Sequence, residues 1–107
     1  MKTNQKKVAP VLSIEVLERV ASMLRLLAHP HRLKIIEFLE HRAEGAPVHE
    51  IRRHLDLPHA ATSQHLNQMK RVGLVKSERR AKEVWYAIAD ERALTILGCI
   101  RKQQGQS

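Results

Sequence analysis

Apolar positions in the chain recur mostly every three or four residues, which is the spacing of an α-helix that buries one face. Helical spacing runs through four successive stretches, 14–28, 30–45, 48–55 and 58–73. The pattern changes to strands at 74–79 and 83–88, and helical spacing returns after Asp90, which is predicted to cap the last helix. The sequence therefore predicts a mainly α fold with a small β-hairpin (α+β), in the order α-α-α-α-β-β-α.

The first helical stretch, which Ser13 is predicted to cap, is apolar on two faces. One face carries Ile14, Leu17, Ala21, Leu24 and Ala28, and the other carries Val16, Val20, Met23 and Leu27. A helix with two apolar faces needs two partners. We expect one face to pack on its own domain and the other to form a dimer surface. The next helix starts at Pro30 and is predicted to end near Gly45, followed by a loop through Pro47.

Residues 48–73 form two short amphipathic helices around a turn at Asp56-Leu57-Pro58, where Asp56 tolerates a left-handed conformation. The inward face of the second helix holds Thr62, Leu66 and Met69. Its outward face holds Ala60, Gln64, Asn67 and Arg71, flanked by Ser63, Gln68 and Lys70, with no acid. Solvated helix faces usually mix both charge signs. An acid-free face of amides, hydroxyls and arginine suits hydrogen bonds to base edges and phosphates.

The charge balance points to a polyanionic partner, either nucleic acid or an anionic membrane surface. The chain has 19 Lys and Arg against 11 Asp and Glu, a formal net charge of +8. Residues 59–82 contain six of these basic side chains and one acid, Glu78. The single cysteine, Cys99, excludes an intrachain disulfide and indicates a reducing compartment. With no apolar run of membrane length and no secretory leader, we expect a cytoplasmic protein.

The expected domain plan is a flexible basic arm over 1–11, one folded domain over 12–104 and a polar tail over 105–107. An enzyme is not expected, because the chain has no glycine-rich phosphate loop. Ser63 and His65 also stand two residues apart on a helix, so they do not face each other as a nucleophile and base.

The segments LLAHPHRLKIIEFL and EIRRHLDLPHAATSQHLNQMKRVGLVKSERRAKEVWYAIAD resemble the ArsR/SmtB family of bacterial winged helix-turn-helix repressors, over roughly Ala21 to Asp90. The resemblance implies a homodimer joined through the first and last helices. It implies a recognition helix in each major groove of an imperfect palindrome, and an inducer that weakens DNA binding. The interface implied for this chain is Val16, Val20, Met23, Leu27, Leu94, Leu97 and Ile100.

The resemblance also places the DNA-binding residues. The recognition helix would contribute His59, Ala61, Ser63, Gln64, His65, Gln68, Lys70 and Arg71, and the wing would contribute Arg79, Arg80 and Lys82. Lys70 and Arg71 suit phosphates better than bases. His65 either contacts phosphate or braces the helix. Ala81 stands where the family often has glycine at the wing tip, so this tip is expected to be stiffer or differently shaped.

Neither metal site familiar in this family is intact, since residues 47–50 lack cysteine and no histidine follows Asp90. His29 and His31 are assigned a structural role, and the remaining histidines show no ligand spacing along one helix. We therefore predict no metal and no cofactor, with an unknown small-molecule inducer or none. Cys99 is interpreted first as a packing residue. The alternatives are a thiol-responsive repressor that uses Cys99 and a non-specific architectural DNA-binding protein.

Overall fold

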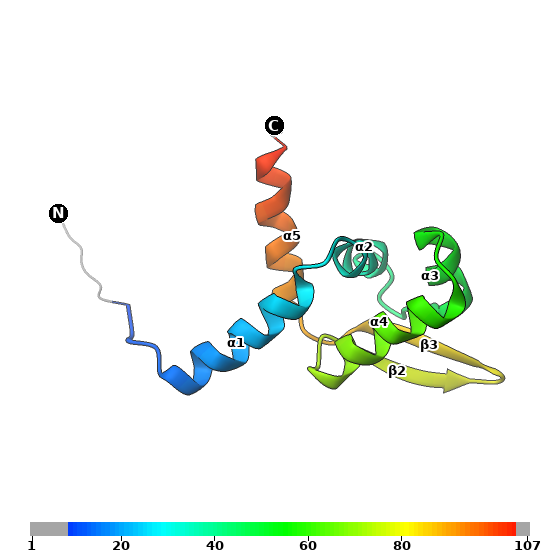
Figure 1. The fold of residues 1–107 in the computed structure, drawn as a ribbon, viewed down its shortest axis with the longest axis horizontal. Helices are drawn as coiled ribbons and strands as arrows, with labels where there is room; N and C mark the ends of the chain where they lie inside the picture. The colour runs from blue at the N-terminus through cyan, green and yellow to red at the C-terminus, as the bar shows by residue number, and fades with distance from the viewer. Residues whose placement is uncertain (1–8, 105–107) are drawn as a thin grey trace.

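The computed structural model describes residues 9–104, which form a winged helix-turn-helix domain (Figure 1). Its elements are α1 Ile14–Leu27, α2 Pro30–Leu39, β1 Ala46–Pro47, α3 Val48–Leu55, α4 His59–Arg71, β2 Val75–Arg80, β3 Glu83–Ile88 and α5 Arg92–Gln103. The predicted fold class is confirmed. Residues 1–8 of the predicted arm and the predicted tail at 105–107 lie outside the described residues. No helix in the range 9–104 is long and apolar enough to span a membrane.

The sheet contains a short strand that the sequence did not reveal. β1 pairs antiparallel with β3, Ala46 opposite Tyr86 and Pro47 opposite Trp85, so the three strands lie in the order β1-β3-β2. The prediction of a loop through Pro47 is therefore wrong. A two-residue strand shows no alternation, and a proline without an N–H group is accommodated at a sheet edge.

α2 ends at Leu39, well before the predicted end near Gly45. Polar residues follow Leu39, and the chain turns twice, with the Arg42 N–H donating to the Leu39 carbonyl at 3.0 Å and the Gly45 N–H donating to the Arg42 carbonyl at 2.8 Å. Gly45 has φ +88°, and a Cβ there would overlap the Tyr86 carbonyl oxygen. Glycine therefore allows β1 to approach β3.

The predictions for Ser13 and Asp56 at helix ends are confirmed, and Asp90 lies one residue before the cap position. The Ser13 Oγ accepts from the Val16 N–H at 3.2 Å at the start of α1. Asp56 ends α3 in the left-handed conformation, with φ 57° and ψ 48°. Glu91 is the N-cap of α5, and the Oδ1 of the preceding Asp90 accepts from the Arg92 N–H at 3.0 Å where the helix begins. These local bonds satisfy backbone groups that a helix end leaves without a partner.

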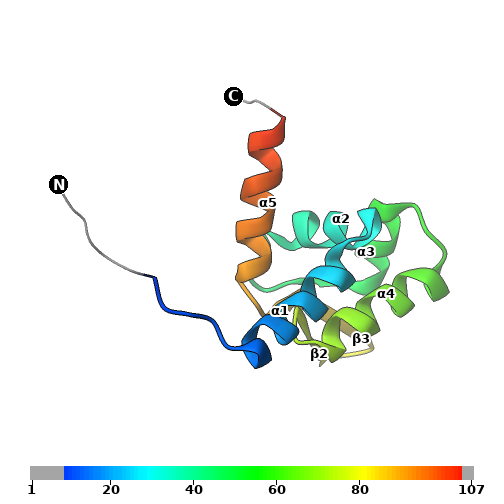
Figure 2. The same cartoon turned by 60° about the vertical axis from the view of Figure 1, so that its left-hand side comes forward.

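α2 lies at the centre of the core and packs against α1, α3, α4 and α5. The largest fully buried side chains are Ile35, Ile36, Leu39, Ile51, Thr62, Leu66, Met69, Leu74 and Val75. α1 and α5 leave this body at the end away from the α3–α4 turn (Figure 1, Figure 2). The arrangement leaves α4 and the β2–β3 wing together on one side of the domain.

Of the four α1 residues that we assigned to the dimer surface, two are buried in the protomer, and Val16 and Val20 are half-buried. Met23 and Leu27, which we assigned to the dimer surface, are 6% and 2% exposed and belong to the protomer's own core. Ile14, Leu17 and Leu24, on the other face, are 61%, 43% and 46% exposed. Periodicity identified both stripes, but the bend at the start of α2 decides which stripe meets the core.

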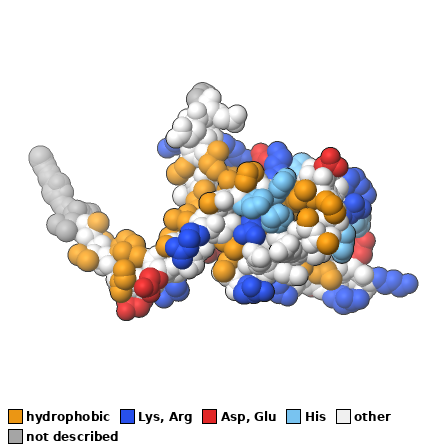
Figure 3. All heavy atoms as spheres, viewed as in Figure 1, with side chains coloured by type: hydrophobic (Ala, Val, Ile, Leu, Met, Phe, Trp, Pro, Cys, Tyr) orange, Lys and Arg blue, Asp and Glu red, His pale blue; other side chains and the backbone are white. Residues whose placement is uncertain are grey.

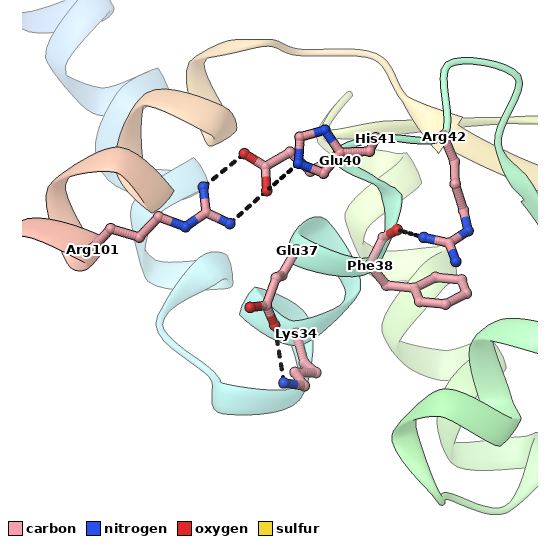
Figure 4. A network of polar contacts seen from close by, with 7 residues as sticks. All are labelled: Lys34, Glu37, Phe38, Glu40, His41, Arg42 and Arg101. Carbon is pink, nitrogen blue, oxygen red and sulfur yellow. Dashed lines mark hydrogen bonds and ion pairs between the residues drawn. The ribbon is translucent and has the colours of Figure 1, made fainter. Parts of the chain in front are cut away.

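A bidentate ion pair joins α5 to the end of α2 (Figure 4). The Arg101 guanidinium donates to both Glu40 carboxylate oxygens, from Nη2 at 2.6 Å and from Nη1 at 2.8 Å. This hydrogen bonding holds the pKa of Glu40 below its ordinary value. Of the apolar side chains that we predicted at the α5 interface, Leu97 is buried, Leu94 is half-buried and Ile100 is exposed. Ile100 is therefore the member of this group most open to a partner.

Candidate nucleic-acid interface

The helix-turn-helix unit is positioned by the inward face of α4. Thr62, Leu66 and Met69 are completely buried there, as the 3.6-residue period predicted. The Thr62 hydroxyl donates to the Pro58 carbonyl at 3.1 Å, so the one polar group in this row has a partner. The opposite face of α4 is thereby fixed toward solvent.

The outward face of α4 presents polar side chains that bond to no other described residue. Gln64, Asn67, Lys70 and Arg71 are exposed. Within residues 9–104 their side chains make no hydrogen bond or ion pair with another residue. The row contains amide donors and acceptors near the middle of the helix and two cations at its end. These groups suit base edges and phosphates, respectively.

The N-terminal part of α4 holds three other residues that we predicted to contact DNA. His59 is exposed, and its Nε2 lies 3.4 Å from the Ser63 Oγ, one helical turn away. Ala61 and Ser63 are half-buried. Ser63 is therefore already within reach of a histidine on its own helix.

His65 and Gln68 are bound to Arg32, at the start of α2. The Arg32 Nε donates to the His65 Nδ1 at 3.0 Å, and its Nη2 donates to the Gln68 Oε1 at 2.6 Å. The third contact of the same guanidinium is a bond from Nη1 to the Leu26 carbonyl at 3.1 Å. Of the two roles left open for His65, its contacts are those of a brace. Gln68 is braced in the same way, although we predicted it among the DNA contacts.

Arg32 is the site residue that sequence reasoning missed. It follows the HPH segment, and no acid stands three or four residues from it on α2. An arginine with no acid three or four residues away was the available signal. Its partners lie 33 and 36 residues away in the sequence, so spacing alone does not name them.

Three histidines that appeared unrelated in the sequence meet beside Arg32. One ring nitrogen from each of His29, His31 and His65 lies within 4.8 Å of the other two, and all three side chains are half-buried. Burial lowers the pKa of His65, and the neighbouring His29, Arg32 and His31 lower this pKa further. Figure 3 shows pale-blue histidine side chains grouped on this face of the molecule. His65 stands 34 residues beyond His31 in the sequence, so ligand spacing along one helix does not reveal this group.

The three basic side chains that we predicted in the wing have different surroundings. Arg79 and Lys82 are exposed. Arg80 instead donates to the Glu78 carboxylate and, at 3.0 Å, to the Glu44 carbonyl, and it lies over the Trp85 ring, 4.3 Å from its centroid. Arg80, which we predicted as a DNA contact, is thus occupied in holding the hairpin together.

The structure also describes the backbone at the wing tip and the exposure of the single cysteine. Ala81 has φ 55°, a left-handed conformation that most residues avoid, in the turn where the family often has glycine. Cys99 is exposed on α5 in the protomer, so it does not pack in the protomer's own core. The tip is accordingly strained at one residue, and the thiol is accessible in the protomer.

Comparisons with known proteins agree with this geometry. A family model described as a helix-turn-helix domain matches residues 27–78. The HTH-type transcriptional regulator YgaV of Escherichia coli is 34% identical over 84 residues, which cover 78% of this chain and 84% of the relative. The HTH-type transcriptional repressor SmtB of Mycobacterium tuberculosis is 37% identical over 83 residues, covering 78% of this chain and 60% of the relative.

A solved structure provides the matching fold. It is the homodimeric winged helix-turn-helix DNA-binding domain of a possible ArsR-family transcriptional regulator from Mycobacterium bovis. The TM-score is 0.71 at 25% sequence identity, covering 85% of this chain and 82% of the other. With the sequence matches and the exposed, acid-free face of α4, these similarities show that the chain belongs to the ArsR/SmtB family of winged helix-turn-helix DNA-binding transcriptional regulators.

Proposed function

We propose that the protein is a homodimeric repressor that binds an imperfect palindrome in double-stranded DNA. The observation that carries this proposal is the exposed row on α4 of Gln64, Asn67, Lys70 and Arg71, which the described part of the protein leaves without partners. Gln64 lies near the middle of α4 and is assigned to a base edge. Lys70 and Arg71 are assigned to phosphates, together with Arg79 and Lys82 of the wing.

The second half of the proposal concerns the dimer. The exposed face of α1 and the outer end of α5 offer Ile14, Leu17, Leu24 and Ile100 as apolar surface. A protomer of 12.3 kDa gains by covering these side chains, because exposed clusters of large apolar residues commonly mark protein interfaces. Two-fold pairing would present two α4 helices, and half-sites about one helical turn apart fit that symmetry.

A selection experiment tests DNA recognition. The full chain is incubated with a random duplex pool, bound duplexes are sequenced, and affinities for the selected site and a scrambled site are measured at physiological salt. A regulator should enrich a two-fold symmetric site and bind it at least about 10³-fold more tightly than scrambled DNA. Equal affinity for both duplexes would instead identify a non-specific architectural DNA-binding protein.

A matched pair of variants tests the dimer. Leu24→Glu places a charge in the exposed apolar face of α1, whereas Ser22→Glu places the same charge on an exposed polar position of that helix. Leu24→Glu should weaken self-association about tenfold or more in sedimentation experiments, because the interface would bury an unpaired carboxylate. The Ser22→Glu variant should associate like the parent. Equal association of all three proteins would place the interface elsewhere.

A further inference from the structure

The cluster of His29, His31 and His65 lies between two parts of the protein, the α1–α2 junction and helix α4. His29 and His31 flank Pro30 at the junction of α1 and α2, while His65 lies on the recognition helix α4. The His29 and His65 rings meet edge to face, with centroids 4.6 Å apart, and the His31 ring lies 6.0 Å from that of His65. A ligand held by all three imidazoles would bridge the junction to α4.

The chemistry of the cluster selects the ligand. The described residues place no carboxylate in this group, so it offers three imidazole nitrogens and no competing oxygen ligand. Imidazole suits divalent zinc, cobalt, nickel and copper, and a three-histidine set leaves one position for water in a tetrahedral site. Zinc–nitrogen bonds of about 2.0–2.1 Å put such nitrogens about 3.3 Å apart. The three atoms, within 4.8 Å of one another, therefore have to close by at most about 1.5 Å.

We propose that His29, His31 and His65 bind one divalent transition-metal ion of this class. The site differs from the two metal-site positions of the family discussed above, which are residues 47–50 and the helix after Asp90. It draws its ligands instead from the start of α2 and from α4, and it becomes visible only when these helices pack together.

The hydrogen bonds already present predict what the metal would change. A neutral imidazole has one free lone pair and one N–H group. The His65 Nδ1 accepts from Arg32, so its lone pair is on Nδ1 and its proton is on Nε2. A metal bound at Nδ1 replaces Arg32 directly. A metal bound at Nε2 moves the proton to Nδ1, which then faces a donor. In either case the bond between Arg32 and His65 is broken.

The same reasoning applies at the start of α2. The His29 Nδ1 accepts from the His31 N–H at 3.2 Å and caps the helix, so a metal on His29 removes this cap. Arg32 would keep its bonds to the Leu26 carbonyl and to Gln68. Metal binding would thus loosen one of the bonds that hold α4, and it should weaken binding to DNA. This last consequence rests on the proposed function, whereas the site itself does not.

Cobalt provides a direct probe of the site. The full chain under reducing conditions is titrated with Co²⁺ while its visible d–d absorption is recorded, and Zn²⁺ is then added to displace it. We expect one ion per chain. His31→Ala should weaken Co²⁺ binding about tenfold or more, because it removes one of three ligands without removing the Arg32 contact or the His29 side chain. His41→Ala is the matched control, since His41 is 85% exposed and lies outside the cluster.

The outcomes are separable. Absence of Co²⁺ and Zn²⁺ binding, or equal binding by the parent, His31→Ala and His41→Ala, would overturn the site. Circular dichroism checks that His31→Ala is folded, and His31→Gln is the substitute if it is not. The effect on DNA is measured separately, as the affinity for the selected duplex with and without Zn²⁺. A loss of affinity in the parent that is missing in the His31 variant supports the link through Arg32, and an unchanged parent affinity overturns that link. DNA binding without metal tests the proposed function alone.

Discussion

Gln64 and Gln68 lie one turn apart on α4, yet they face different neighbours. Gln68, together with His65, is bound to Arg32 at the start of α2, whereas Gln64 is exposed and has no side-chain partner among the described residues. The same division occurs in the wing, where Arg80 is held against Trp85 and Arg79 is exposed. In each element, one polar side chain fixes the geometry and its neighbour is left for a ligand. A preorganised element loses less conformational entropy when it binds.

The test with the largest expected effect removes Arg32, which anchors α4 to the start of α2. Arg32→Ala should lower the free energy of unfolding by about 2–3 kcal/mol, because it removes hydrogen bonds to three acceptors on α1 and α4 together. Urea denaturation followed by circular dichroism measures the change. Arg32→Lys is the control: it keeps the charge, but it lacks the planar fork, so most of the destabilisation should remain. A change below about 0.5 kcal/mol would mean that the anchor is not structural.

The second test compares the two glutamines. Gln64→Ala should reduce discrimination between the selected and scrambled duplexes by about 1–3 kcal/mol for each base that Gln64 reads. Its stability should stay within about 0.5 kcal/mol of the parent, because the side chain is exposed. Gln68→Ala should do the reverse, lowering stability by about 1 kcal/mol and leaving discrimination nearly intact. Identical effects of the two substitutions in binding titrations would erase the distinction between them.

The third test concerns the cations of the wing. Arg79→Ala with Lys82→Ala should weaken binding to every duplex, and the log–log dependence of affinity on salt should become shallower by about 0.9 for each phosphate that is no longer neutralised. Arg80→Ala should leave that slope unchanged and lower stability by about 0.5–1 kcal/mol, because the guanidinium no longer stacks on Trp85. A shallower slope for Arg80→Ala alone would show that this side chain leaves Trp85 for DNA.

The smallest expected effect is at the wing tip. Ala81→Gly removes roughly 1–2 kcal/mol of left-handed strain, and the greater freedom of glycine in the unfolded chain offsets about 0.4–1 kcal/mol of that gain. The net result should be a stabilisation of at most about 1.5 kcal/mol, with an unchanged salt slope. Thermal melts detect the difference. A destabilised variant would imply that the alanine methyl group makes a contact that offsets the strain.

Local patterns predicted most of this fold because its helices and hairpin have a clear period. The buried row of Thr62, Leu66 and Met69 follows directly from 3.6-residue spacing. The role of Ser13 as a cap needed only its neighbours along the chain. β1 escaped prediction, because a strand of two residues is defined by its pairing with β3 and not by its own sequence.

Local patterns do not predict which of several similar side chains is buried or bonded, because that depends on how helices pack. α1 carries two apolar stripes, so burial of Met23 instead of Leu24 depends on how α1 meets α2. The outward polar residues of α4 are alike in chemistry, and only the position of Arg32 separates Gln68 from Gln64. The meeting of His29, His31 and His65 has the same origin, since it requires helices distant in the sequence to pack side by side.

The exposed face of α1 has a consequence for how this protein responds to dilution. If a second copy covers Ile14, Leu17 and Leu24, part of the stability of the fold comes from association. That part varies with the concentration of the protomer. The melting temperature should then rise with concentration, and dilution should favour separated subunits that are less stable than the dimer. A cell that makes little of such a regulator would hold more of it as separate subunits, which are less stable and more open to proteolysis. Abundance would thereby set both occupancy of the DNA site and the lifetime of the protein.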